Sequence, residues 1–156
     1  MSGAGTTVGA MFVERVRELF DGASEGEPTW VTSGGPRGGL LGAIGELGAD
    51  QASRVLGTTT VASHVNHLVF SVGMVNRWAA GQEPTGDWAG SWAVKAVAED
   101  EWRALIASLR TEAEALLAGP AKELDWSSAE QANYGFSTLA HTAYHLGAVK
   151  HMITQL

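Results

Sequence analysis

The chain contains no cysteine, and this absence excludes both disulfide bonds and thiolate metal ligands. Long apolar runs are missing too. Although hydrophobic residues make up 45% of the sequence, no stretch approaches the roughly 20 consecutive apolar residues that a membrane-spanning helix needs. We therefore expect a soluble protein that has no membrane partner.

Basic residues are few and scattered along the chain. There are 10 Lys and Arg against 17 Asp and Glu, which gives a net charge of -7. No basic cluster is present of the kind that displaces counterions from phosphates, so we expect no nucleic-acid partner. The N-terminus lacks the basic segment and following apolar run of a secretory signal, and a cytoplasmic location is expected.

What the sequence does contain is helical periodicity. Its 156 residues suit a single domain that covers 1–156. Apolar residues recur at intervals of three and four, and no segment alternates as a strand does, so we predict an all-α fold in the form of a helix bundle. The predicted helices, four long and one short, cover residues 7–21, 40–47, 60–80, 98–118 and the segment from Ser127 or Ser128 to Thr154.

Two histidines near the C-terminus are spaced for a shared ligand. His141 and His145 are four residues apart in the last predicted helix, so their imidazoles lie one turn apart on the same face. Apolar and small residues share that face, which therefore points toward the core. Two imidazoles in this arrangement can reach one metal ion.

A third histidine is expected to complete the site. On a helical wheel of residues 60–80, His64 lies at the centre of the buried face and His67 lies to one side of it. If this helix packs against the last one, His64 meets His141 and His145, and three imidazoles hold a divalent ion with positions left open for water or substrate. His67 is an alternative ligand. The competing interpretation is a hydrogen-bonded histidine core without metal.

Other conspicuous residues are given structural interpretations. His151 faces away from the pair and is expected at the surface, and Tyr144 lies on a flank of the helix as a weak candidate for a proton donor. We expect Trp88 and Trp92, in the connection after the second long helix, to anchor that connection against the bundle or a second subunit.

These positions resemble the DinB/YfiT-like family of metalloenzymes. The resemblance covers essentially the whole chain in order and rests on three segments: His64-Val65-Asn66-His67-Leu68, the tryptophan-rich connection at 87–92, and the last-helix motif that runs from His141 through His145 to Gly147. It implies an up-down-down-up four-helix bundle, often homodimeric. It also implies that His64, His141 and His145 bind the metal, with His67 as the alternative.

The resemblance also suggests an activity. Some members of such families are thiol S-transferases or isomerases that use mycothiol or bacillithiol, so the chain is expected to bind a divalent Zn, Ni or Fe ion and to act on a small electrophilic substrate with a low-molecular-weight thiol as cofactor. A metal-dependent hydrolase and a non-enzymatic, stress-associated metal-binding bundle are the alternatives. No general base or other catalytic residue can be assigned from the sequence.

Overall fold

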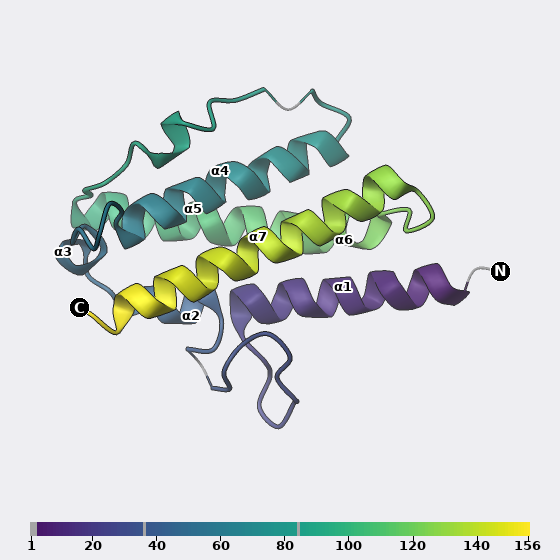
Figure 1. Cartoon of the computed structure of the whole chain (residues 1–156), viewed down its shortest axis with the longest axis horizontal. Coiled ribbons are helices and arrows are strands. Elements are labelled where there is room, and N and C mark those ends of the chain that lie inside the picture. Colours follow the sequence, from purple (N-terminus) through teal and green to yellow (C-terminus); the bar gives the residue numbers. More distant parts are fainter. Residues whose placement is uncertain (1–2, 36, 84) are drawn as a thin grey trace.

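The computed structural model describes residues 3–35, 37–83 and 85–156, and in these residues the chain is helical, with an isolated bridge between Leu56 and Thr59 and no strand. Figure 1 shows the arrangement. The long helices are α1 (Gly3–Asp21), α4 (Val61–Ala79), α5 (Glu99–Ala118) and α7 (Ala129–Ile153). The short ones are α2 (Leu40–Gly45), α3 (Ala49–Ala52), α6 (Pro120–Glu123) and the 3-10 turn η1 (Gly90–Trp92). The predicted all-α class is confirmed.

Local hydrogen bonds explain where the two histidine-bearing helices begin. The hydroxyl of Thr60 accepts a hydrogen bond from the backbone N–H of Ser63 at 3.1 Å, which caps α4. Likewise, the Ser128 hydroxyl accepts from the Gln131 N–H at 3.4 Å and caps α7. At the far end of α4, Gly81 takes a positive φ of 73° that a residue with a side chain rarely adopts, and the helix stops.

The long helices bury one contiguous apolar core. α4 packs against both α5 and α7, and α1 packs against α7. The side chain of Trp102 on α5 is fully buried, and its indole N–H donates to the Leu47 carbonyl at 2.8 Å. Each buried Leu or Phe contributes about 1.5–3 kcal/mol through removal of apolar area from water. Among the described helices, none has both the length and the hydropathy that a membrane crossing needs.

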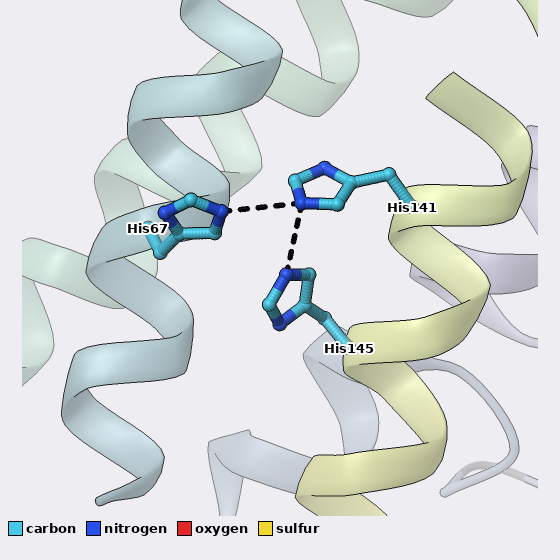
Figure 2. A group of neighbouring side chains, drawn as sticks. All are labelled: His67, His141 and His145. Carbon is cyan, nitrogen blue, oxygen red and sulfur yellow. Dashed lines mark hydrogen bonds between the residues drawn. The ribbon is translucent and has the colours of Figure 1, made fainter. Parts of the chain in front are cut away.

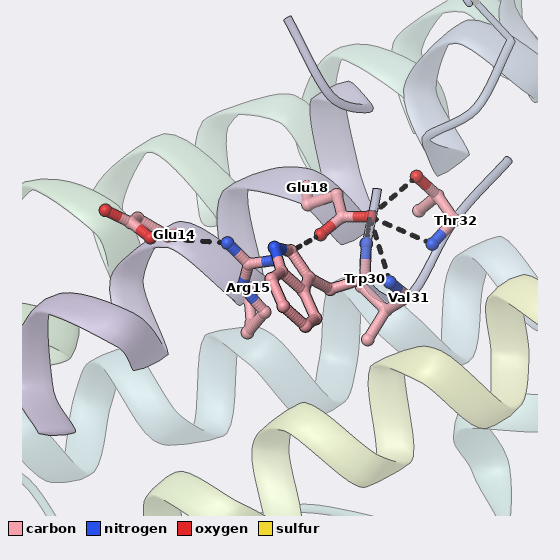
Figure 3. A network of polar contacts seen from close by, with 6 residues as sticks. All are labelled: Glu14, Arg15, Glu18, Trp30, Val31 and Thr32. Atoms are coloured by element: carbon pink, nitrogen blue, oxygen red, sulfur yellow. Dashed lines mark hydrogen bonds and ion pairs between the residues drawn. The ribbon is translucent and has the colours of Figure 1, made fainter. Parts of the chain in front are cut away.

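The glycine-rich connection between α1 and α2 is fixed to α1 by a single buried carboxylate (Figure 3). One oxygen of Glu18 accepts hydrogen bonds from the backbone N–H groups of Trp30, Val31 and Thr32 at 2.9, 2.9 and 3.0 Å and from the Thr32 hydroxyl at 3.0 Å. Its other oxygen pairs with Arg15 at 2.8 Å. Burial alone raises the pKa of Glu18, but these hydrogen bonds outweigh it and hold the pKa below its usual range.

The connection from α4 to α5 returns along α4 and carries the two tryptophans. The Trp92 ring stacks on His67 with centroids 4.3 Å apart and an interplanar angle of 21°. Trp88 contacts the Phe70 ring edge-to-face at 4.9 Å while half of its own surface stays exposed. The expectation that these tryptophans anchor the connection on the helices is therefore confirmed.

Candidate metal centre

The buried faces of α4 and α7 bring three imidazoles to one point (Figure 2). Nε2 of His141 lies 3.1 Å from Nε2 of His67 and 3.0 Å from Nε2 of His145. One ring nitrogen from each of the three lies within 4.8 Å of the others. His67 and His145 are buried, and His141 is partly exposed at the edge of the cluster.

His64 meets His145, as the sequence predicts, but it lies outside the group of three converging nitrogens. It is buried, as expected, but its Nδ1 lies 2.9 Å from Nδ1 of His145, on the opposite side of that ring from His141. Its Nε2 lies 3.2 Å from the hydroxyl of Thr59. The three converging nitrogens thus come from His67, His141 and His145, so the geometry favours the alternative ligand that the sequence left open. Which imidazoles bind an ion stays a prediction.

Hydrogen bonding fixes the tautomer of His67. The Ser91 hydroxyl donates its only hydrogen to the Trp88 carbonyl at 2.6 Å. Its oxygen lies 2.7 Å from Nδ1 of His67 and therefore accepts the Nδ1–H. Nε2 of His67 is left without a hydrogen, and its lone pair points at His141. In proteins generally, a metal-binding histidine is oriented by a hydrogen bond of this kind, which its other ring nitrogen donates to a neighbouring acceptor.

Hydrogen bonds alone cannot satisfy all of the ring nitrogens that face one another in the cluster. A ring nitrogen has one in-plane position, which holds either a hydrogen or a lone pair. Nε2 of His141 is in close contact with two other nitrogens, at 3.0 and 3.1 Å, so it forms a good hydrogen bond with only one of them. A cation satisfies all three lone pairs at once. Imidazole nitrogens about 2.0–2.1 Å from an ion at angles of 90–110° are about 2.9–3.4 Å apart, which matches the two contacts of His141. The remaining pair of nitrogens, from His67 and His145, lies within 4.8 Å.

The imidazoles of the cluster are neutral near pH 7 because their pKa values are lowered. Burial is the main cause that lowers the pKa of His145 to about 3, followed by repulsion from His141, His64 and His67. For His67, burial and then repulsion from His141 and His64 lower the pKa to about 4. Burial also lowers the pKa of His64 and His141. Neutral imidazole is the form that binds metal, so the ligands are available near pH 7.

A cavity of about 520 Å³ adjoins the cluster at His141. It lies between α4 and α7, and Trp88 of the connection closes part of it. This volume is within the range of small-molecule binding sites. Because His141 belongs both to the cluster and to the cavity wall, a molecule in the cavity has access to an ion held by the three nitrogens.

Comparisons of the chain with protein-family models, with curated proteins and with solved structures found no match. The resemblance to DinB/YfiT-like proteins therefore rests on the histidine motifs and the tryptophan-rich connection, and membership of that family stays a proposal.

The remaining sequence expectations have mixed outcomes. His151 is exposed, as predicted. Tyr144 is 68% exposed on the flank of α7, where its ring meets the edge of His145 at a centroid distance of 5.0 Å. Sequence reasoning missed Ser91 and Thr59, the hydroxyl partners of the histidines. Only the position of Ser91 between two tryptophans could have drawn attention to it.

Proposed function

We propose that this protein is a divalent-metal-dependent enzyme of the DinB-like type, folded as an up-down-down-up four-helix bundle. The observation that carries the proposal is the convergence of three Nε2 atoms, one of them fixed as a lone pair by Ser91, beside an open cavity. Three protein ligands with an open side are typical of catalytic rather than structural metal sites. Zinc, nickel and ferrous iron all suit such a set of imidazoles.

The most specific activity that we propose is thiol S-transfer to a small electrophile, with mycothiol or bacillithiol as the thiol. A bound divalent ion supplies positive charge that lowers the pKa of a thiol. The residues of the chain have separate tasks: His67, His141 and His145 hold the ion, and Ser91 orients the ring of His67. Trp92 covers one face of that ring at 4.3 Å and excludes water there.

Metal content is the first test. Protein purified without a histidine tag should contain close to one divalent ion per chain by elemental analysis, and His67→Ala, His141→Ala or His145→Ala should each reduce this content severely. His151→Ala is the matched control, because this histidine lies on the same helix and is exposed. Equal, substoichiometric metal in the wild type and all variants contradicts the proposal.

The thiol cofactor needs a separate test. In a cobalt-substituted protein, addition of mycothiol or bacillithiol should produce the strong near-ultraviolet absorption of a cobalt–thiolate bond. The band should be absent from His141→Ala. A stoichiometric cobalt site that gives no such band with either thiol would favour a metal-dependent hydrolase or a non-enzymatic metal-binding bundle.

A homodimer is also part of the proposal. Phe136 and Tyr144, on α7, are 61% and 68% exposed, and large exposed apolar side chains of this kind favour a protein partner. Light scattering on a size-exclusion column should give twice the chain mass of 16.3 kDa. A single-chain mass at high protein concentration contradicts this part alone.

A further inference from the structure

The residues that line the cavity beside His141 determine which kind of ligand it can bind. Its apolar wall is formed by side chains of α4 and α7 together with one tryptophan of the connection: Val72, Met74, Val75, Trp78, Trp88 and Tyr134. None of the described residues that line it is Lys, Arg, Asp or Glu. A cavity of this size next to a proposed metal centre is the natural place for a substrate.

Flat aromatic surfaces dominate this wall. Trp78 of α4 and Tyr134 of α7 stack on each other with centroids 4.0 Å apart and an angle of 20° between their planes. The Trp88 ring is held edge-to-face against Phe70 at 4.9 Å, yet Trp88 is 50% exposed and has surface left to cover. Rigid rings of this kind favour a flat aromatic partner, which packs in offset or edge-to-face contact.

The polar side of the cavity includes two hydroxyl groups that act as acceptors. These groups already donate their hydrogens to helix carbonyls: Thr138 to Tyr134 at 2.7 Å and Ser71 to Leu68 at 3.3 Å. Their oxygens therefore present lone pairs to the cavity. An anion finds neither Lys nor Arg among the described lining residues, so in metal-free protein its charge is left unpaired, which is strongly disfavoured.

A cationic ligand is disfavoured for a different reason. The described lining contains no carboxylate, and an ion bound by His141 would place two positive charges at the end of the cavity. In metal-free protein, neither sign of charge on the ligand is therefore compensated by a charged residue of the described lining.

We propose that the cavity binds an uncharged, flat aromatic compound, with its rings against Trp78, Tyr134 and Trp88 and its reactive group toward His141. As the substrate class of the metal site, this inference rests on the function proposed above. The binding preference itself is measurable without turnover.

Three naphthalene probes of matched shape test the charge preference. Methyl 2-naphthyl sulfone is neutral, 2-naphthalenesulfonate is anionic, and 2-naphthyltrimethylammonium is cationic; none is a strong metal ligand. Calorimetric titration of the full chain after dialysis against a chelator should show binding of the neutral probe about tenfold tighter than either ion. Equal affinities, a preference for either ion, or no binding of the neutral probe overturns the proposal.

A charge placed in the cavity tests the location. Ser137 lines the cavity and is exposed, so Ser137→Lys should fold normally and should shift the preference toward the sulfonate by about tenfold. Ala140→Lys is the matched control, because this residue is exposed on the same helix and does not line the cavity. An unchanged preference in Ser137→Lys, with the fold confirmed by circular dichroism, shows that the probes bind elsewhere.

The two proposals can fail separately. If the chain binds the neutral probe selectively but contains no metal, the proposed enzyme function fails and the ligand class stands. If the metal is present and lost in His141→Ala while the probes show no preference, the metal centre stands and the ligand class is wrong.

Discussion

His64 and His67 are three residues apart on α4, yet they contact different parts of the histidine cluster. Nε2 of His67 points at His141, whereas Nδ1 of His64 contacts Nδ1 of His145 and its Nε2 contacts Thr59. If His145 binds an ion through Nε2, its Nδ1 carries the hydrogen and donates it to His64, and His64 in turn donates its Nε2–H to Thr59. His64 then positions a ligand without binding the ion.

This difference predicts distinct effects of two substitutions. His64→Ala should keep close to one ion per chain but weaken metal affinity about 10–100-fold, as the loss of an orienting hydrogen bond usually does. His67→Ala should remove the stoichiometric ion. Competition titration with a chromophoric chelator measures both quantities. If His64→Ala loses the ion as completely as His141→Ala does, His64 is a ligand, as the sequence suggests.

Substitution of Glu18 is expected to lower the free energy of unfolding. Glu18→Ala leaves three backbone N–H groups without their acceptor, and we expect a loss of about 2–4 kcal/mol in the free energy of unfolding by urea denaturation. Glu14→Ala, which removes a 61% exposed partner of the same Arg15, should leave stability nearly unchanged.

The pH dependence of the Glu18 effect follows from its lowered pKa. A carboxylate with a lower pKa in the folded than in the unfolded state stabilises the fold above the unfolded pKa of about 4.3, and this contribution is lost as the pH falls through the folded value. The stability difference between wild type and Glu18→Ala should therefore shrink below about pH 4.3. A difference that stays constant into stronger acid contradicts this account.

At the level of the element, the residue that precedes α4 fixes where this helix begins. Three consecutive threonines, Thr58, Thr59 and Thr60, precede α4, and the cap is Thr60, whose buried hydroxyl accepts the Ser63 N–H. Thr59 is instead in contact with His64. The cap therefore sets the start of the helix that places His64 and His67 one and two turns later.

Thr60→Ala should lower the free energy of unfolding by about 1–2 kcal/mol, because it removes the cap of a helix that packs against both α5 and α7. Thr58→Ala is the control: Thr58 is exposed, and its backbone carbonyl, which the substitution keeps, accepts a hydrogen bond from Lys95 at 2.8 Å. Thermal and urea unfolding of both variants measure the difference. Equal losses in the two variants would show that Thr60 does not act as the cap.

For the whole molecule, the buried histidines couple stability to pH. The unfolded chain protonates its histidines near pH 6.5, whereas in the folded chain His67 and His145 take protons only near pH 4 and 3. The unfolded state thus binds more protons between these values, so stability falls as the pH decreases below about 6.5.

In metal-free protein, His67 and His145 alone should contribute a loss that approaches about 2.7 kcal/mol per pH unit between pH 6 and about 4.5, since each of the two protons contributes about 1.4. The lowered pKa values of His64 and His141 add to this loss. Urea unfolding at a series of pH values measures the slope. His151→Ala, which removes an exposed histidine, should leave it unchanged. A flat profile would show that the buried rings are already protonated in the folded state.

Much of the fold follows from the sequence alone because helices are local. Apolar spacing, caps such as Ser128 and stops such as Gly81 act over a few residues, so the limits of the long helices agree with the prediction to within a few residues. The inward orientation of the buried histidines is local in the same sense. A pattern of period 3.6 shows which face of a helix is buried before its partner is known.

The sequence could not decide which histidine of α4 meets the pair on α7. His64 and His67 are about 60° apart around the helix axis, and both are 5% exposed, so burial does not distinguish them. The choice depends on how α4 and α7 cross, and packing of the whole core sets that crossing. The contact of Ser91 with His67 and the aromatic cavity also depend on tertiary packing, because each is formed by segments that are distant in the sequence.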